Sequence, residues 1–552
     1  MRTRLAVFAL AGALFAGCSN LSEDKNKQDS KAAADEPDLG LMLLTESAPM
    51  MAVAPVPFRG GRDDFNTEEY GRIEDTGFHT AVADPLSTFS IDVDTASYSN
   101  TRRFIGDSQL PPPDAVRIEE FINYFTYDYP APEGTDPFSV TTELSGCPWN
   151  RGHLLALIGI QGKKVETADL PDSNLVFLLD VSGSMDEPDK LPLLKKAFRL
   201  LVDQLGPRDR VAIVVYAGAA GTVLPSTAGD KKERILDAID QLDAGGSTAG
   251  GEGIKLAYRT ARDNFIEGGN NRVILATDGD FNVGVSSDGE LVRLIEDERR
   301  GGIFLTVLGF GTGNLKDSKM EALADKGNGN YAYIDGVLEA KKVLVNQLGG
   351  TLLTIAKDVK IQVEFNPALV KGYRLIGYVN RKLDNEDFAD DRKDAGELGA
   401  GHSVTALYEI IPAGSEETVP DAGGLKYQNV GISPAGLESG EWMTVKLRYK
   451  EPQGEESILI TRTVEGTPEP LEASSENFRF AAAVAEFGLL LRGSEYKGDA
   501  SYPQVLELAR GAKGTDAEGY RSEFIRLAET AEILSRNDAR DSGGKKPESP
   551  AD

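Results

Sequence analysis

The sequence predicts a multidomain α/β protein in which a mostly parallel, helix-covered sheet is inserted into a β-rich, sandwich-like domain. Between residues 174 and 350, short apolar runs such as LVFLL and VAIVVY alternate with helical stretches. Such runs are typical of parallel strands that are buried on both faces. Strand patterns lie on both sides of this region, and helical patterns lie near the two ends of the chain.

The flanking strands are predicted from alternation of apolar and polar residues. Residues 138–163 read as strands, and in MTVKLRYK (443–450) every second residue is apolar, which indicates a sheet with one solvated face. VKIQVEF (359–365) alternates in the same way. We therefore expect strands from before and after the central domain to assemble into one sandwich.

Helical segments are predicted at both ends of this assembly. Residues 89–93 alternate like a strand and lead into a helix that Asp94 or Thr95 could cap. Apolar residues at 118, 121, 122 and 125 fall on one helix face, and residues 475–534 are again helical in pattern.

The N-terminus has the pattern of a signal peptide. Two arginines precede the apolar run 5–15, which is too short for a permanent membrane span, and Phe15-Ala16-Gly17-Cys18 resembles a bacterial lipobox with phenylalanine where leucine is usual. The resemblance implies lipidation at Cys18, and Ser19 gives no inner-membrane retention signal. We expect a lipid-anchored protein of the bacterial cell envelope, at the outer membrane and facing the periplasm. The alternative is an ordinary secretory signal with an incidental cysteine.

Composition restricts the partners. With 59 basic and 88 acidic residues the net charge is −29, so the surface repels nucleic acid and anionic lipid headgroups, and membrane attachment would come from the lipid. Beyond Cys18 the one cysteine is Cys147, which we expect to be a buried small hydrophobe without a disulfide.

Oxygen-bearing side chains follow three predicted strand ends in the central region. Asp180, Ser182 and Ser184 follow the first strand, Thr248 lies in GGSTAGG, and Asp278 follows the strand VILAT. Ligands of open parallel sheets gather at the carboxyl ends of the strands. Carboxylates and hydroxyls are the donors that hard divalent cations prefer, so we expect a Mg²⁺ site, with Mn²⁺ or Ca²⁺ as alternatives.

These motifs resemble the von Willebrand factor A domain, a Rossmann-like fold, and its metal-ion-dependent adhesion site. The resemblance implies that the serine and threonine hydroxyls hold the metal directly and that the carboxylates act through water. An Asp or Glu carboxylate from a protein partner would then complete the shell. Without a metal, Asp180 would cap its loop and the serines would satisfy backbone groups.

The resemblance extends over roughly residues 65–535 to a largely uncharacterised family of bacterial A-domain lipoproteins. Its members share segments such as LPPPDAVRIEEFINYF, CPWN and GFGTGNLKDSKMEALADKGNGNYAYID with this chain. We accordingly expect a signal peptide (1–17), a disordered tether (18–65), an N-terminal helical and strand module (66–135), sandwich strands (136–170), the A domain (171–350), a β-rich domain (351–470), a C-terminal helical segment (471–535) and a disordered tail (536–552).

Two further patterns have competing interpretations. Ser90, Asp92 and Asp94 would share a strand face and could bind a second cation, but we favour a turn-capping role. GFGTGN (309–314) lacks the third glycine of a dinucleotide fingerprint, which favours a tight turn of the A domain.

Enzymatic signatures are missing from the sequence. His79, His153 and His402 show no HExxH spacing, GGSTA is not a nucleophile elbow, and no P-loop is present. We expect each histidine at the surface or in a turn, and the protein to be a binding or scaffold module and not an enzyme. The alternative is a structural or chelatase-like accessory component with a vestigial or regulatory metal site. A further hypothesis is regulatory: the last A-domain helix, near 338–353, could relay the occupancy of the metal site to the sandwich and the helical tail.

Overall fold

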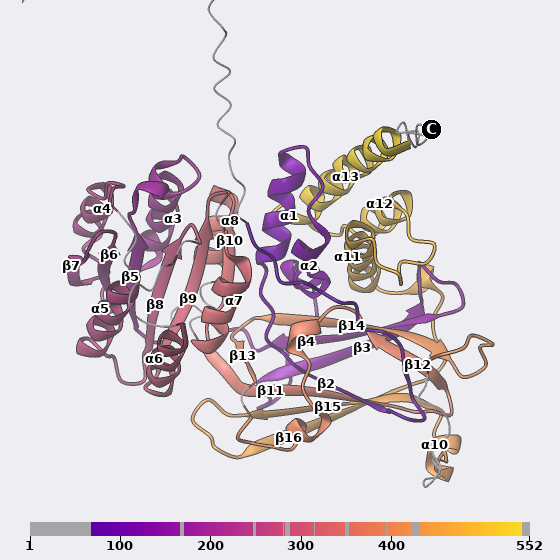
Figure 1. Cartoon of the computed structure of the whole chain (residues 1–552). Helices are drawn as coiled ribbons and strands as arrows, with labels where there is room; N and C mark the ends of the chain where they lie inside the picture. Colours follow the sequence, from indigo (N-terminus) through magenta and orange to yellow (C-terminus); the bar gives the residue numbers. More distant parts are fainter. Residues whose placement is uncertain are drawn as a thin grey trace, which may run out of the picture. The chain divides into compact units, whose positions relative to one another are not determined.

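Three β-sheets organise the described part of the chain (Figure 1). The computed structural model describes residues 68–165, 170–246, 250–279, 281, 288–313, 315–347, 353–393, 395–420 and 431–543. The predicted signal peptide, lipidated Cys18 and tether therefore lie outside the described residues.

The central region forms a six-stranded sheet in the order β10-β9-β8-β5-β6-β7. Its strands are β5 (Ser173–Asp180), β6 (Arg210–Tyr216), β7 (Ala220–Ala228), β8 (Asn270–Thr277), β9 (Ile303–Phe310) and β10 (Tyr331–Ile334). All pairings are parallel except the one between β6 and the edge strand β7. The mostly parallel sheet that the buried apolar runs predicted is confirmed.

Helices cover both faces of this sheet. One face carries α3 (Leu191–Gln204), α4 (Lys232–Asp240) and α8 (Val337–Lys341), which continues as a π-helical turn (Lys342–Asn346); the other carries α5 (Gly250–Asp263), α6 (Asp288–Arg300) and α7 (Asp317–Lys326). The apolar stripe of each helix is buried against the strands, which is the arrangement that amphipathic helices on a two-sided sheet adopt.

The other two sheets form a sandwich around a second hydrophobic core. One sheet has the order β1-β12-β14-β4-β3, and the other has β13-β11-β15-β16 with β2 paired to β11. The strands are β1 (His79–Thr80), β2 (Leu86–Ser90), β3 (Phe138–Gly146), β4 (Leu154–Gly162), β11 (Thr354–Phe365), β12 (Val370–Leu375), β13 (Gly396–Gly399), β14 (Ser403–Pro412), β15 (Glu441–Lys450) and β16 (Ser457–Glu465). Because β3 and β4 precede the α/β region and β11 to β16 follow it, the predicted insertion is confirmed. On β15 the alternate residues from Met443 to Tyr449 are buried in this core, as predicted.

The terminal helices share a third core with the outer face of the sandwich. They are α1 (Ala96–Gly106), α2 (Ile118–Tyr124), α11 (Glu476–Arg492), α12 (Tyr502–Gly511) and α13 (Tyr520–Gly543). The short helix α10 (Pro434–Glu438), between β14 and β15 in the chain, is not one of them. Their apolar residues pack together with Leu155 and Leu157 of β4 and Leu407 of β14. Segments from the two ends of the chain thus lie side by side, which Figure 1 shows for α1, α2 and α11 to α13.

Three boundaries differ from the prediction. Residues 66–135 do not form a separate module, because β1 pairs with β12 and β2 pairs with β11. A two-residue and a five-residue strand cannot form a stable sheet alone, so they complete the sandwich. The strand predicted over 89–93 ends at Ser90. The last helix continues to Gly543, past residue 535, where the sequence pattern becomes polar.

Candidate functional site

The predicted site lies at the carboxyl ends of two neighbouring strands. Asp180 is the last residue of β5, Asp278 follows the end of β8, and the two strands pair in parallel up to Leu179 and Ala276. Both carboxylates are almost fully buried, whereas Ser182 is buried and Ser184 is exposed. The structure therefore brings four of the five predicted ligands to one edge of the sheet.

The loop after β5 turns its hydroxyls toward one another. The Ser182 backbone N–H donates to Asp180 Oδ1 at 2.9 Å, and the Ser182 and Ser184 hydroxyl oxygens lie 3.0 Å apart across a short 3₁₀ turn. Gly245 N–H donates to the Val181 carbonyl at 2.7 Å, so the loop that leads to Thr248 lies against this turn. Thr248 itself lies outside the described residues. Its segment follows α4 and precedes α5 in the chain, so the prediction that it follows a strand was wrong.

The electrostatics of this edge favour a positive charge. Burial raises the pKa of Asp180 to about 6, the hydrogen bonds from Ser182 oppose the rise, and the charge of Asp278 adds to it. Lys190 supplies one cation: its Nζ lies 3.1 Å from Asp278 Oδ2 and donates to the Ser184 carbonyl at 2.9 Å. Lys190 was not among the predicted site residues, because no motif spacing marks it in the sequence.

The donor set fits a hard divalent cation. Two buried carboxylates and two adjacent hydroxyls are oxygen donors of the type that Mg²⁺, Mn²⁺ and Ca²⁺ take. The bond from Ser182 N–H to Asp180 is also what loop capping predicts, but capping alone does not explain why the two hydroxyls meet. In the described residues, no three His, Cys, Asp or Glu side chains are grouped to hold a metal ion, so a site here depends on its hydroxyls.

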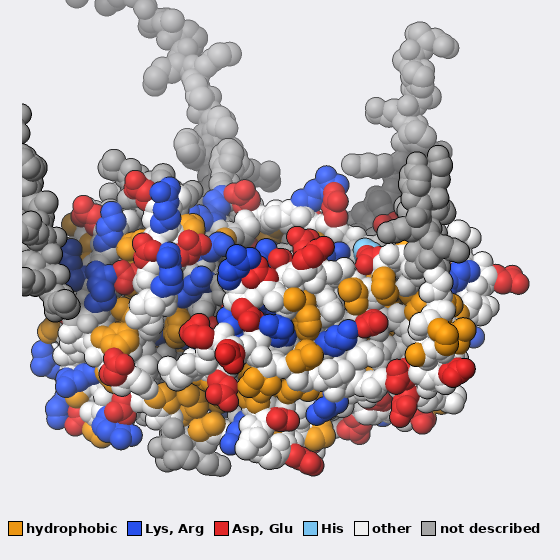
Figure 2. Space-filling model, turned by 90° about the horizontal axis from the view of Figure 1, so that it is seen from below, with side chains coloured by type: hydrophobic (Ala, Val, Ile, Leu, Met, Phe, Trp, Pro, Cys, Tyr) orange, Lys and Arg blue, Asp and Glu red, His pale blue; other side chains and the backbone are white. Residues whose placement is uncertain are grey.

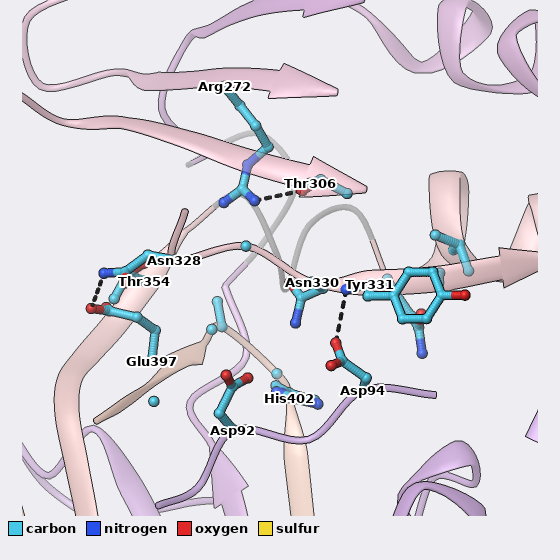
Figure 3. A pocket seen from close by; sticks show the side chains of 18 of the residues that line it. Asp92, Asp94, Arg272, Thr306, Asn328, Asn330, Tyr331, Thr354, Glu397 and His402 are labelled. Carbon is cyan, nitrogen blue, oxygen red and sulfur yellow. Dashed lines mark hydrogen bonds between the residues drawn. The ribbon is translucent and has the colours of Figure 1, made fainter. Parts of the chain in front are cut away.

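The second predicted polar group lies elsewhere and already has a counter-charge. Ser90, Asp92 and Asp94 line a cavity of about 1240 Å³ (Figure 3). Asp94 accepts a bond from the Tyr331 backbone N–H at 2.7 Å, and Arg381 lies 3.0 Å from Asp94 and 3.3 Å from Asp92. Arg381 thus supplies the positive charge that we considered for a second cation. Asp94 does not cap α1, whose N-cap position is Thr95 without a side-chain bond.

This cavity lies at the amino ends of the parallel strands, away from Asp180. Arg272 near the start of β8 donates to the Thr306 hydroxyl of β9 at 2.7 Å, and Asn328 donates to Glu397 of β13 at 3.1 Å (Figure 3). Its lining carries charges of both signs.

His153 lies in a turn, as predicted, and its backbone N–H donates to the Asn150 carbonyl at 3.0 Å. Its ring is buried, with Nδ1 2.6 Å from Glu409 Oε1 and Nε2 2.7 Å from Glu417 Oε2. These hydrogen bonds raise its pKa although burial opposes them. The two acids are far from residue 153 in the sequence, so no local pattern indicated this environment. Cys147 is buried, as predicted.

Comparison with known proteins matches most of the chain to known protein families. Family models match at residues 64–156 (von Willebrand factor), 174–345 (von Willebrand factor type A domain) and 350–534 (Uncharacterized protein YfbK, C-terminal). A relative described as Uncharacterized protein YfbK of Escherichia coli (strain K12) is 44% identical over 473 residues, which cover 84% of this chain and 81% of the relative. An uncharacterized protein of Synechocystis is 30% identical over 167 residues, which cover 30% of this chain and 39% of that protein.

Among solved structures, a von Willebrand factor type A protein from Catenulispora acidiphila matches 72% of this chain and 91% of its own, with a TM-score of 0.39 and 15% identity. The A domain is of a type that commonly mediates protein interactions, and this indicates an interaction or scaffold module. From the matches over residues 64–156, 174–345 and 350–534, and from the shared length with the Escherichia coli protein, the chain belongs to the YfbK family of von Willebrand factor A-domain proteins.

Proposed function

We propose that the protein is a cell-envelope binding module that captures an acidic side chain of a partner protein through a divalent cation at the edge of the A-domain sheet. The proposal depends above all on one observation: Asp180, Ser182, Ser184 and Asp278, which the chain supplies from two separate segments, meet at this edge. The cation would be Mg²⁺, with Mn²⁺ and Ca²⁺ as alternatives.

The predicted ligand residues would have two different roles at the ion. Ser182, Ser184 and Thr248 would hold the ion with neutral oxygens, and Asp180 and Asp278 would orient water and hydroxyl groups around it. The bound ion would act as a Lewis acid for one more oxygen ligand. Since most of the ligands are neutral, the ion keeps a strong attraction for an external carboxylate, and that preference would select an Asp or Glu of the partner.

Attachment to the outer membrane through a lipid on Cys18, with the protein facing the periplasm, completes the proposal. None of the helices in the described ranges is both long and apolar enough to cross a bilayer. On the face drawn in Figure 2, acidic and basic side chains of the described residues are interspersed and form no continuous basic surface. Together with the net charge of −29 this argues against a nucleic-acid partner.

Binding without catalysis is part of the proposal. The buried ring of His153 belongs to the sandwich, where both ring nitrogens face carboxylates. At the edge around Asp180, the two carboxylates would orient the groups around the ion, and Lys190 already lies against Asp278. In this proposal neither carboxylate acts as a general base that activates water for hydrolysis.

A second candidate is a structural or chelatase-like accessory component with a vestigial or regulatory metal site. The observation that favours it is that buried ion pairs fasten the A domain to the rest of the chain. Arg102 of α1 lies 2.6 Å from Asp335, and Arg117 lies 2.7 Å from Asp317. Such contacts suit a domain that acts as a fixed part of a larger body.

Calorimetric titration of Mg²⁺, Mn²⁺ and Ca²⁺ into residues 19–552 tests the proposal, beside a folded variant that carries Asp180→Ala and Thr248→Ala. Binding by the native chain alone supports the site, and a pull-down with and without chelator then searches for the acidic partner. If native and variant bind cations equally, the metal-bridged function is wrong. If chelation melts the fold but leaves partner binding unchanged, the structural role is the better account.

A further inference from the structure

Lys190 is a built-in cation at the edge where the divalent ion is expected. It precedes α3, and its side chain is 8% exposed. Its Nζ contacts two of the predicted ligand residues, the Asp278 carboxylate at 3.1 Å and the Ser184 carbonyl at 2.9 Å. The ammonium therefore lies beside the metal ligands and is not a solvated surface charge.

The fold reserves space for this side chain. Gly311, in the GFGTGN segment, has a φ of +75°, and a Cβ on it would lie 2.5 Å from Lys190 Cγ and 2.8 Å from Cδ. The Gly311 carbonyl accepts a bond from the Tyr333 hydroxyl at 2.9 Å, which fixes the backbone over the lysine methylenes. A glycine at 311 is thus required twice, by its positive φ and by the lysine that passes beneath it. This confinement keeps the ammonium near Asp278.

We propose that Lys190 is a resident counter-charge that weakens cation binding and strengthens binding of the partner's carboxylate. The inference rests on the proposed function. Formal charges give the reason: a divalent ion with Asp180 and Asp278 alone is neutral, whereas the same group with Lys190 carries a net charge of +1. The lysine therefore opposes entry of the ion, and a negative ligand that reaches the filled site meets a positive field.

The size of the effect follows from Coulomb's law. A unit charge about 6 Å from a divalent ion changes its binding by roughly tenfold even at the dielectric constant of water, and by more where the site is partly dry. Replacing Lys190 by a neutral residue should consequently raise Mg²⁺ affinity by about tenfold or more.

The test compares Lys190→Met with the native chain of residues 19–552. Lys196→Met is the matched control, because Lys196 lies on the same helix, is exposed, and its replacement changes the net charge equally. Calorimetry with Mg²⁺ and Mn²⁺ gives the first readout. We expect about tenfold tighter binding in Lys190→Met and unchanged binding in Lys196→Met. Lys190→Gln serves as the second neutral variant if Lys190→Met does not fold.

The second readout uses acetate as the carboxylate probe. Acetate is titrated into each Mn²⁺-loaded protein, and displacement of Mn²⁺-bound water is followed by water-proton relaxation. We expect Lys190→Met to need several-fold more acetate than the native chain, so the two affinities move in opposite directions.

Each pattern of results has one meaning. Tighter ion binding with weaker acetate binding supports the inference. Unchanged or weaker ion binding in the neutral variant overturns the inference. The proposed metal site is still supported in that case, because the native chain binds the ion. Binding by the variant but not by the native chain supports the inference while removing the metal site as the native function. No binding by either protein overturns both.

Discussion

Removing the Arg102 guanidinium should destabilise the protein more than removing any exposed arginine. Arg102 of α1 binds both oxygens of Asp335 at 2.6 Å, Glu339 of α8 at 2.7 Å and Glu523 of α13 at 2.9 Å. One side chain thus joins the N-terminal helix, the end of the A domain and the C-terminal helix. The perturbation is Arg102→Met, which keeps much of the side-chain volume and removes the charge.

The magnitude follows from what the variant would leave behind. Glu339 is 1% exposed and Asp335 is 14% exposed, so two carboxylates would remain largely buried without their shared cation. Breaking a buried pair by removing one partner costs about 3–5 kcal/mol. We discount for Glu523, which is 24% exposed and can be hydrated, and expect a loss of about 3 kcal/mol in the free energy of unfolding.

The loss should also depend on pH. Burial raises the pKa of Asp335 in the native protein and Arg102 opposes that rise, so the variant's Asp335 has a higher folded-state pKa still. A folded carboxyl that binds a proton more tightly than the unfolded one stabilises the fold at low pH and loses that contribution as pH rises. The deficit relative to the native chain should therefore be smaller at pH 5 than at pH 8.

Urea unfolding followed by circular dichroism measures both effects. Arg300→Met is the control, because Arg300 and its partner Asp297 are each 69% exposed and such pairs contribute about 0–1 kcal/mol. Equal losses in the two variants would show that the Arg102 network does not fasten the three segments together. A deficit that does not shrink at pH 5 would show that unpaired buried carboxylates are not its cause.

Three further predictions concern single sites. Ser184→Ala should weaken Mg²⁺ binding by about tenfold or more, as measured by calorimetry. The midpoint of urea unfolding should stay unchanged because the Ser184 side chain is exposed, and a shifted midpoint would contradict this. Gly311→Ala should destabilise the fold by about 1–3 kcal/mol in urea, and a neutral result would refute the required positive φ. Burial raises the pKa of Glu120 to about 8 and of Glu321 to about 7, so stability should fall as pH rises from 5 to 9, and Glu321→Gln should flatten that profile.

Much of the fold could be predicted because its signals are local. A run such as LVFLL or an alternation such as that of β15 depends on which faces of a strand are buried, and that information lies within a few residues. The pairing of β2 with β11 was not predictable, because Phe89 meets Ile361 only through the sandwich register. The same limit explains why residues 66–135 looked like a separate module.

The candidate site, too, could be predicted only where its residues are close together in the sequence. Asp180, Ser182 and Ser184 follow one strand and carry a recognisable spacing, so the sequence predicted them together. Lys190 contacts Asp278 across 88 residues and Arg102 contacts Asp335 across 233 residues, and no spacing marks either pair. The tertiary fold determines which residue pairs with a buried charge. The residue type alone does not reveal whether a lysine or an arginine is solvated or buried.

The relay from metal site to sandwich depends on whether the last A-domain helix can move. Its π-helical turn holds Lys342, which is buried, donates to the Tyr124 carbonyl at 2.7 Å and has its pKa lowered to about 7 by burial. A shift of this helix would break that bond and the contact of Glu339 with Arg102, so a relay must disturb α1 and α2 together with β11. Hydrogen exchange, measured with and without Mg²⁺ and acetate, tests whether this helix moves. Coupled changes in α2, α8 and β11 support the relay, whereas equal protection in all three means that the buried contacts hold the helix fixed and the site works without it.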